Sequence, residues 1–223
     1  MTKIAPWSFS RIKDFDTCPK QFYHKHILKE LPFEETEATR YGNQFHKAAE
    51  EFIRNGTPVP DRFAFARPTL EALDAKPGDK FCEYKFGLTR ELEPCSFYAK
   101  DVWFRGIIDL LIVHEDRAWI VDYKTGKSSR YAETGQLELM ALATFKFFPH
   151  VTSVNAGLVF VVADEFVKDK YALETEGEMW AKWLGEYAKM EKAAETGVWN
   201  PKPSGLCRAH CKVLECPHNG KGR

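Results

Sequence analysis

The chain has 223 residues, of which 44% are hydrophobic and 29% are charged. These proportions are typical of a globular protein and exclude a disordered, collagen-like or coiled-coil chain. The 32 basic and 32 acidic residues cancel, so any basic groove for nucleic acid must be local. No apolar run reaches the ~18 residues of a membrane helix, and residues 1–11 lack the apolar core of a signal peptide. We therefore expect a soluble, cytoplasmic protein with no membrane partner.

The first third of the chain has helical periodicity. Proline is favoured in the first turn of a helix, so Cys18-Pro19 indicates the start of a second helix. Asn55-Gly56 is typical of a helix end. Four prolines after this point predict irregular structure. The expected helices are a hairpin over 8–28, a helix over 41–54 and a short helix near 68–73, all within an N-terminal helical part of residues 1–78.

Strand-like patterns begin at residue 80, where polar and apolar side chains alternate. Two apolar runs joined by His114-Glu-Asp-Arg117 predict a hairpin of central strands that are buried on both faces. The segment as a whole therefore predicts a sheet core over residues 79–175. The expected strands cover 80–86, 96–102, 104–113, 118–123, 156–163 and 171–173, with a helix over 133–148.

A charged amphipathic helix over 178–196 follows, within residues 176–198. The tail, residues 199–223, has three prolines, three glycines, three cysteines and two histidines. It has too few aliphatic residues to form a core of its own, so something else must order it. We expect one α/β domain over 1–223, with a mixed sheet flanked by helices.

Two carboxylates and a lysine stand at the ends of the predicted hairpin strands. Asp122 and Lys124 are two residues apart, so they share one face, and the hairpin brings Asp109 beside them. Buried carboxylates are costly unless they bind a partner, and Mg²⁺ or Mn²⁺ is the natural one. Lys124 beside such a cation suits phosphodiester hydrolysis. The alternative is a capping role for Asp109 and a surface ion pair between Asp122 and Lys124.

Five motifs in order resemble the RecB-like branch of the PD-(D/E)xK nucleases, which includes the CRISPR-associated exonucleases and the AddB nuclease domain. The motifs are Gly42-Asn-Gln-Phe-His46, Glu83, Gly106-Ile-Ile-Asp109, Asp122-Tyr-Lys124 and Gln136-Leu137. The resemblance spans most of the chain. It implies a restriction-endonuclease-like core and the activity of a metal-dependent deoxyribonuclease.

The resemblance also implies roles for single residues. Lys124 is the implied catalytic lysine, and Gln136 is implied to orient the substrate phosphate beside the catalytic carboxylates. Read without the resemblance, a lone helical histidine such as His46 is more often a core or capping residue than a metal ligand. The implied metal ligands are His46, Asp109, Asp122 and the backbone carbonyl of Tyr123.

Three further residues are candidate substrate contacts, namely Arg11, Glu83 and Arg105. Strand alternation alone would aim Glu83 at solvent, so it ranks below the other acidic residues. Family members often have a tyrosine four residues after the glutamine, and this chain has Met140 there. One substrate contact of the family is therefore missing, whereas the metal chemistry is unaffected.

The tail cysteines, Cys207, Cys211 and Cys216, lie in a segment that cannot fold by burial, which is the usual situation of a structural metal site. In the family that the chain resembles, an early Cys-Pro-x-x-Phe element joins three such cysteines around a four-iron four-sulfur cluster. Cys18-Pro-Lys-Gln-Phe22 matches that element. The resemblance therefore implies a cluster held by Cys18 and the three tail cysteines.

The spacing of the tail cysteines leaves alternatives open. Three and then four residues separate them, where two and then five are familiar. Use of His210 or His218 as a ligand would suit tetrahedral zinc instead, and three unrelated thiols are a third interpretation. Cys82 and Cys95 lie in or beside predicted strands and are interpreted as ordinary core residues.

Taken together, the motifs predict a metal-dependent DNA exonuclease that hydrolyses phosphodiester bonds at DNA ends during repair, recombination or processing. The expected partner is DNA, single-stranded or with free ends, with a helicase or recombination protein beside it. The alternative is a noncatalytic DNA-end-binding or assembly subunit of a nuclease–helicase complex. An RNA or structure-specific nuclease would use the same residues equally well.

Overall fold

The structure, a computed structural model, describes residue 4 and residues 6–221. The chain divides into two compact units. The sheet unit is Glu35–Met179, and the terminal unit is Met1–Glu34 with Trp180–Arg223. No described helix combines the length and the apolar character that crossing a bilayer requires. The expected single domain over 1–223 stays a prediction, and its outermost residues, 1–3, 5 and 222–223, lie outside the described part.

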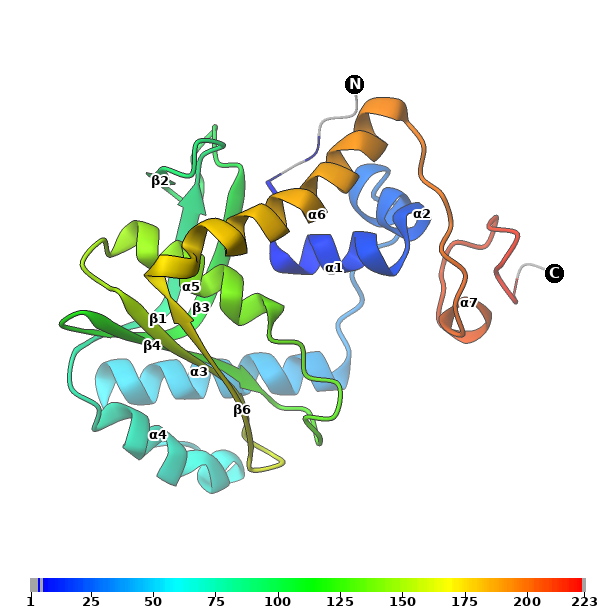
Figure 1. Ribbon diagram of the computed structural model, residues 1–223. Helices are drawn as coiled ribbons and strands as arrows, with labels where there is room; N and C mark the ends of the chain where they lie inside the picture. Colours follow the sequence, from blue (N-terminus) through cyan, green and yellow to red (C-terminus); the bar gives the residue numbers. More distant parts are fainter. Residues whose placement is uncertain (1–3, 5, 222–223) are drawn as a thin grey trace. The chain divides into compact units, whose positions relative to one another are not determined.

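Helices and strands alternate along the sheet unit, and helices dominate the terminal unit (Figure 1). The helices are α1 (Phe9–Thr17), α2 (Pro19–Phe22), a π-helical turn (Tyr23–Ile27), α3 (Glu37–Asn55), a 3₁₀ helix (Asp61–Ala66), α4 (Arg67–Asp74), α5 (Gly135–Phe147), a 3₁₀ turn (Leu173–Thr175), α6 (Glu176–Thr196) and α7 (Leu206–Ala209). The strands are β1 (Asp79–Leu88), β2 (Pro94–Cys95), β3 (Phe104–His114), β4 (Arg117–Lys124), β5 (Ser153–Phe160) and β6 (Glu165–Ala172).

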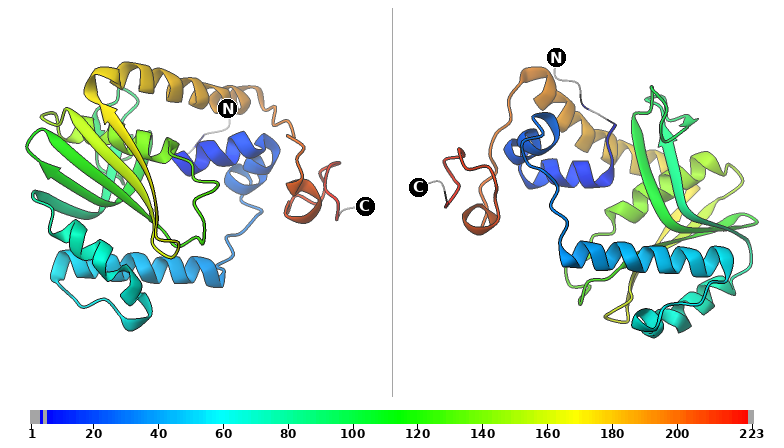
Figure 2. Two further views of the ribbon diagram at one scale, coloured as in Figure 1. Left: turned by 60° about the horizontal axis from the view of Figure 1, so that its bottom comes forward. Right: turned by 180° about the vertical axis from the view of Figure 1, so that it is seen from behind.

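The six strands form one mixed sheet in the order β2-β1-β3-β4-β5-β6. All neighbours are antiparallel except β4 and β5, which are parallel. A parallel pair needs a crossover, and α5 supplies it. In Figures 1 and 2, α5 covers one face of the sheet, and α3 with α4 covers the other. The expected α/β fold with a mixed sheet flanked by helices is confirmed.

The core of the sheet unit lies between the sheet and helices α3 and α4. Helix α3 begins at a capping box, in which Thr36 Oγ1 accepts a hydrogen bond from Thr39 N at 3.1 Å, and Gly56 ends it with a positive φ of 65°. Its inner face packs against alternate residues of the central strands. The fully buried contributors include Phe45, Phe63, Leu70, Leu110 and Ile112.

Two expected strands differ from the structure. Residues 96–102 do not form a strand; they turn, with Ala99 N donating to Ser96 O at 2.9 Å. The edge strand expected over 171–173 is instead the longer β6, which pairs with β5 through its backbone. An edge strand exposed on both faces carries no apolar alternation, so its length cannot be read from the sequence.

The terminal unit has a small aromatic core. Trp7 is completely buried and packs on Tyr187 of α6, with 5.6 Å between the ring centroids. Trp199, at the start of the tail, stacks on Phe22 and Tyr23 at 5.9 and 5.2 Å. The helices predicted over 8–28 are confirmed, and the aromatic contacts of Trp199 join the tail to them.

Candidate active site

The candidate site lies where β3 and β4 separate. The two strands pair from His114–Arg117 as far as Leu110–Val121, and the last residues of β4 pair only with β5. The Tyr123 peptide therefore needs other partners. Its N–H donates to Asp109 Oδ2 at 2.8 Å, and its carbonyl oxygen is 3.1 Å from Nε2 of His46 on α3. The open strand end thus brings an acidic residue and a histidine to the backbone of one residue, Tyr123.

His46, Glu83 and Asp109 form the tightest group of potential metal ligands. His46 Nδ1 is 3.4 Å from Asp109 Oδ2 and 3.9 Å from Glu83 Oε1. Among the described histidines, cysteines and acidic residues, only these three bring ligand atoms within 4.8 Å of one another. The sequence ranked Glu83 below the other acidic residues, and the structure places it beside His46.

A local distortion of β1 explains the position of Glu83. Its φ is +50°, a left-handed conformation that costs a non-glycine residue roughly 1–2 kcal/mol. Phe81 and Tyr84 consequently contact each other at 5.5 Å and both pack on Phe148. In a regular strand, residues three apart would lie on opposite faces. The distortion leaves Cys82 O to accept a hydrogen bond from Arg54 at 2.9 Å.

Asp122, Lys124 and Gln136 form a second, adjoining cluster. Asp122 Oδ2 is 2.5 Å from Lys124 Nζ, and Gln136 Nε2 donates to Asp122 Oδ1 at 2.7 Å. Lys124 Nζ is also 3.4 Å from Gln136 Oε1. Helix α5 starts at Gly135, so its first turn presents Gln136 to the end of β4. The lysine is therefore held between a carboxylate and an amide.

Burial and like charge act on the ionisable groups of the two clusters. Burial, followed by the negative charge of Asp109, raises the pKa of Asp122 to about 6. Burial, again with Asp109, raises the pKa of Glu83. Burial alone would lower the pKa of His46, but its hydrogen bond to Asp109 and the surrounding carboxylates outweigh burial and raise it. The site is therefore rich in carboxylates and favours a cation.

The donor atoms fit a hard divalent cation. Asp122 Oδ2 is buried and accepts no hydrogen bond from the described residues, although Lys124 Nζ is close. Oxygen-rich donors such as these carboxylates are the ligands of Mg²⁺ and Mn²⁺, and one histidine suits Mn²⁺. Of the expected ligands, Asp109 and the Tyr123 carbonyl contact His46, and Glu83 adds a further oxygen beside it. Asp122 lies in the adjoining cluster, where the charge of Asp109 acts on its pKa.

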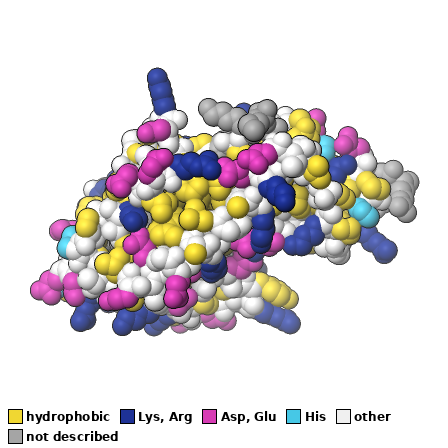
Figure 3. Space-filling view, turned by 45° about the horizontal axis from the view of Figure 1, so that its top comes forward, with side chains coloured by type: hydrophobic (Ala, Val, Ile, Leu, Met, Phe, Trp, Pro, Cys, Tyr) yellow, Lys and Arg dark blue, Asp and Glu magenta, His cyan; other side chains and the backbone are white. Residues whose placement is uncertain are grey.

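Of the two arginines predicted as substrate contacts, Arg105 lies away from the site and Arg11 belongs to the other unit. Arg105 is at the start of β3, four residues or about 13 Å of strand from Asp109. Its guanidinium lies over the Phe97 ring at 4.6 Å, and its Nη1 is 3.4 Å from Phe97 O. Arg11 is on α1 in the terminal unit. In the space-filling view, charges of both signs are interspersed across the face drawn (Figure 3).

All six cysteines are unpaired. In the described residues, no three cysteine sulfurs lie within 4.8 Å of one another. Cys18 nevertheless lies against the tail, since Lys202 N donates to Cys18 Sγ at 3.4 Å. Ser204 N donates to Cys207 Sγ at 3.3 Å, and Glu215, next to Cys216, is 3.4 Å from His24 Nε2. The structure thus brings the N-terminal cysteine and the tail into contact.

The tail is organised by a residue that the sequence did not single out. Asn219 is 2% exposed, and its Nδ2 donates to the carbonyls of Cys211 and Val213 at 3.1 and 3.0 Å. These bonds close a loop around the last two cysteines. A single asparagine in a polar tail carries no sequence signal, because its burial depends on where the loop folds.

Comparisons with known proteins agree with this geometry. The model of the PD-(D/E)XK nuclease superfamily matches residues 6–216. The crystal structure of a candidate exonuclease from Eubacterium rectale is 12% identical, covers 95% of this chain and 90% of its own, and has a TM-score of 0.54, which shows a shared fold. The crystal structure of SSO0001 is 9% identical, covers 98% and 89%, and has a TM-score of 0.42, too low to support an inference. The search of curated proteins gave no match. With nearly the whole length matched, the chain belongs to the PD-(D/E)XK nuclease superfamily.

Proposed function

We propose that this protein is a metal-dependent DNA exonuclease of the RecB-like branch, which hydrolyses phosphodiester bonds at DNA ends. One observation carries the proposal: where β3 and β4 separate, Asp109 contacts His46, and the Asp122–Lys124 pair lies in the adjoining cluster at the end of β4. The superfamily match supports nuclease chemistry. The order of the motifs supports membership of the RecB-like branch. The Eubacterium rectale protein is described as a candidate exonuclease, which favours action at DNA ends.

Each side chain of the site has a role in this proposal. His46, Asp109, Asp122 and the Tyr123 carbonyl would hold Mg²⁺ or Mn²⁺, and Glu83 would complete the acidic group. When bound, the cation would supply an acidified water and neutralise charge on the phosphate. Burial and the negative charge of Asp109 raise the pKa of Glu83, so a cation would relieve the repulsion between these two carboxylates.

Lys124 is the catalytic residue of the proposal. Its ammonium is anchored by Asp122 and lies beside Gln136, so it is held rather than free to swing. A positive group fixed in this way orients the attacking water or stabilises the negative charge that develops on the phosphate, without reorganisation during the reaction. Gln136 keeps Asp122 in place through its amide and can turn toward a substrate phosphate.

The proposal is tested by degradation of end-labelled DNA, both linear and circular, single- and double-stranded, with Mg²⁺ or Mn²⁺. The comparison is between wild type and Lys124→Ala, with Lys100→Ala, an exposed lysine, as the matched control. We expect wild type and the control to degrade linear DNA and spare circles. Cleavage by Lys124→Ala at the wild-type rate would remove the assigned role. Binding without cleavage under either metal would favour the end-binding subunit instead.

We further propose that Cys18, Cys207, Cys211 and Cys216 hold a four-iron four-sulfur cluster, with zinc as the alternative. The support is the contact between Cys18 and the tail and the N–H groups that point at Cys18 and Cys207 sulfurs, which are the hydrogen bonds that stabilise thiolates in such centres. In this role the metal is structural, since the tail has almost no apolar core.

The tail metal is identified by purification without oxygen. A cluster gives brown protein that absorbs near ~400 nm, and elemental analysis finds iron with inorganic sulfide. Colourless protein that contains zinc would replace the cluster by a tetrahedral site. Protein with neither metal, and with all cysteines reactive toward a thiol reagent, would remove the site altogether.

A further inference from the structure

A cavity of the sheet unit lies away from the acidic site. It has a volume of about 780 Å³, within the range of ligand pockets. Alternate residues of a strand face opposite ways, so Trp119 and Val121 line this cavity from one face of β4, whereas Asp122 and Lys124 belong to the other face. The cavity is therefore separate from the candidate active site.

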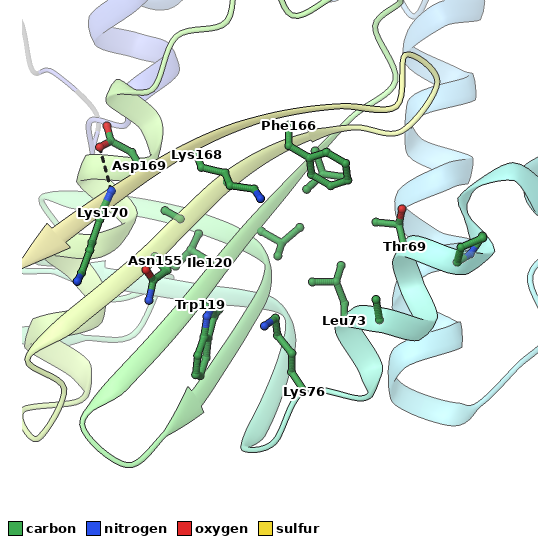
Figure 4. A pocket seen from close by; sticks show the side chains of 16 residues that line it. Thr69, Leu73, Lys76, Trp119, Ile120, Asn155, Phe166, Lys168, Asp169 and Lys170 are labelled. Atoms are coloured by element: carbon green, nitrogen blue, oxygen red, sulfur yellow. Dashed lines mark hydrogen bonds between the residues drawn. The ribbon is translucent and has the colours of Figure 1, made fainter.

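The walls of the cavity come from two different elements (Figure 4). On one side lies α4, which contributes Thr69, Ala72 and Leu73 at the i, i+3, i+4 spacing of a single helical face, and Lys76 follows two residues past its end. On the other side lies the edge strand β6. The floor consists of residues of β4 and β5, and it is apolar apart from Asn155. We call this cavity the back groove.

Gly157 gives the back groove its depth. A Cβ built on this glycine would meet only Val167 O, at 3.7 Å. The neighbouring floor residues Val121 and Val159 belong to the hydrophobic core. An apolar side chain of a partner molecule could therefore pack on the core of the sheet unit. The removal of its apolar surface from water would favour binding.

The rim of the back groove is positively charged. Lys76, Lys168 and Lys170 form no ion pair with any carboxylate of the described residues. Lys76 instead lies 5.0 Å from the Trp119 ring centroid, and Lys168 lies 5.5 Å from that of Phe166. Phe166 is 47% exposed. The rim also carries one carboxylate, Asp169, which accepts a hydrogen bond from the Tyr171 hydroxyl at 3.0 Å. The groove thus combines an apolar floor, two aromatic anchors and three lysines against one carboxylate.

We propose that the back groove binds an amphipathic, acidic helical segment of a partner protein. Apolar side chains of the segment fill the floor, and its acidic residues pair with the three lysines, which is the helix-in-groove mode of recognition. A nucleic-acid strand fits less well, because it stacks on open ring faces and the faces of Trp119 and Phe166 already hold lysines. The proposal does not depend on nuclease activity.

The test uses two matched display libraries of amphipathic helices of ~15 residues. Both vary the apolar positions; one has Asp or Glu at every polar position and the other has Lys or Arg. We expect the acidic library alone to be enriched on the wild-type protein. A synthetic peptide from the enriched pool should bind Gly157→Leu at least about tenfold more weakly, since the new side chain fills the floor.

A charge exchange provides the second variant. Lys168→Glu with Lys170→Glu alters only exposed positions of β6, so the fold is retained, as thermal melting checks. This double variant should lose the acidic peptide and gain peptides of the basic library, whereas Lys100→Glu should behave as wild type. DNA cleavage by Gly157→Leu should remain that of wild type, which keeps this test distinct from that of the proposed function.

Three results would overturn the proposal. The first is absence of enrichment from the acidic library, and the second is peptide binding that Gly157→Leu leaves unchanged. The third is binding of oligo(dT) that is lost in both groove variants while no peptide binds, because the back groove would then be a nucleic-acid site.

Discussion

The sheet unit and the tail of the terminal unit differ in how much apolar surface they bury. In the middle of β3, Leu110, Leu111 and Ile112 are all completely buried. In the described residues of the tail, 199–221, only Val213, Cys216 and Asn219 are buried. An apolar core can hold charged groups that repel one another, whereas a polar tail needs a cross-link to stay folded. A metal ion in the sheet unit would therefore cancel the repulsion between carboxylates, whereas a metal in the tail would keep the tail folded.

The largest effect that this comparison predicts is on activity. Asp109→Asn keeps an oxygen to accept the hydrogen bond of Tyr123 N but removes a metal-binding charge. We expect cleavage of linear DNA to fall by at least ~10³-fold, with little change in melting temperature. Asp101→Asn, at an exposed position, is the matched control. An active Asp109→Asn enzyme would move the metal site away from the end of β3.

The next effect concerns the terminal unit alone. Cys18→Ser should lose the tail metal and make the C-terminus sensitive to protease, while the sheet unit keeps its melting transition. Loss of a cross-link across so long a loop corresponds to roughly 2–4 kcal/mol. Limited proteolysis with mass spectrometry, together with metal analysis, measures it.

Cys95→Ser is the control for that experiment, because Cys95 is in the sheet unit and far along the chain from the tail. Unchanged metal content in Cys18→Ser would assign the fourth ligand to a tail histidine. A fall in the melting temperature of the sheet unit would show that the tail metal also stabilises the sheet unit.

A smaller effect follows from the pKa of Asp122. Folding raises this pKa from 3.8 to about 6, so the folded protein binds the proton more tightly than the unfolded chain. The stabilisation of the folded protein by this tighter proton binding is present at acidic pH and is lost as the pH rises from about 4 to 6. Asp122→Asn should therefore raise the free energy of unfolding of the metal-free protein at pH 7 by about 1–3 kcal/mol.

Denaturant unfolding of the metal-free protein at pH 4 and pH 7 measures this effect. Saturating Mn²⁺ should stabilise wild type, by ~2.7 kcal/mol at one hundred times the dissociation constant, and should leave Asp122→Asn unchanged. A variant less stable than wild type at pH 7 would show that the bond to Gln136 outweighs the cost of burying the charge.

The smallest effect tests the distortion of β1. Glu83→Gly removes the strain of a positive φ and should raise the free energy of unfolding by about 1 kcal/mol. It should also weaken Mn²⁺ binding, since an oxygen donor is lost. Lys85→Gly, two residues along the same strand, should instead destabilise by ~0.5–1 kcal/mol. If both variants are destabilised equally, Glu83 is not strained.

Much of the site could be predicted because its residues are close in sequence. The two-residue spacing of Asp122 and Lys124 sets their common face, and the short hairpin sets the position of Asp109 opposite them. The position of Glu83 beside His46 could not be predicted, because the alternation of β1 breaks at that residue, whose φ is positive. The strand expected over 96–102 failed for a similar reason, since a strand needs a neighbour that the sequence pattern does not specify.

The sequence by itself determined the superfamily motifs, the α/β class, the central hairpin with its charged ends, and the helices around the first cysteine. These features depend on residue type and on short-range periodicity, which the backbone geometry of helices and strands enforces locally. Only the tertiary structure decided that Tyr123 presents its peptide to His46 and Asp109. It also brought Lys76, Trp119 and Lys168 around one groove. Such contacts join distant elements, so they exist only once the sheet and its helices have packed together.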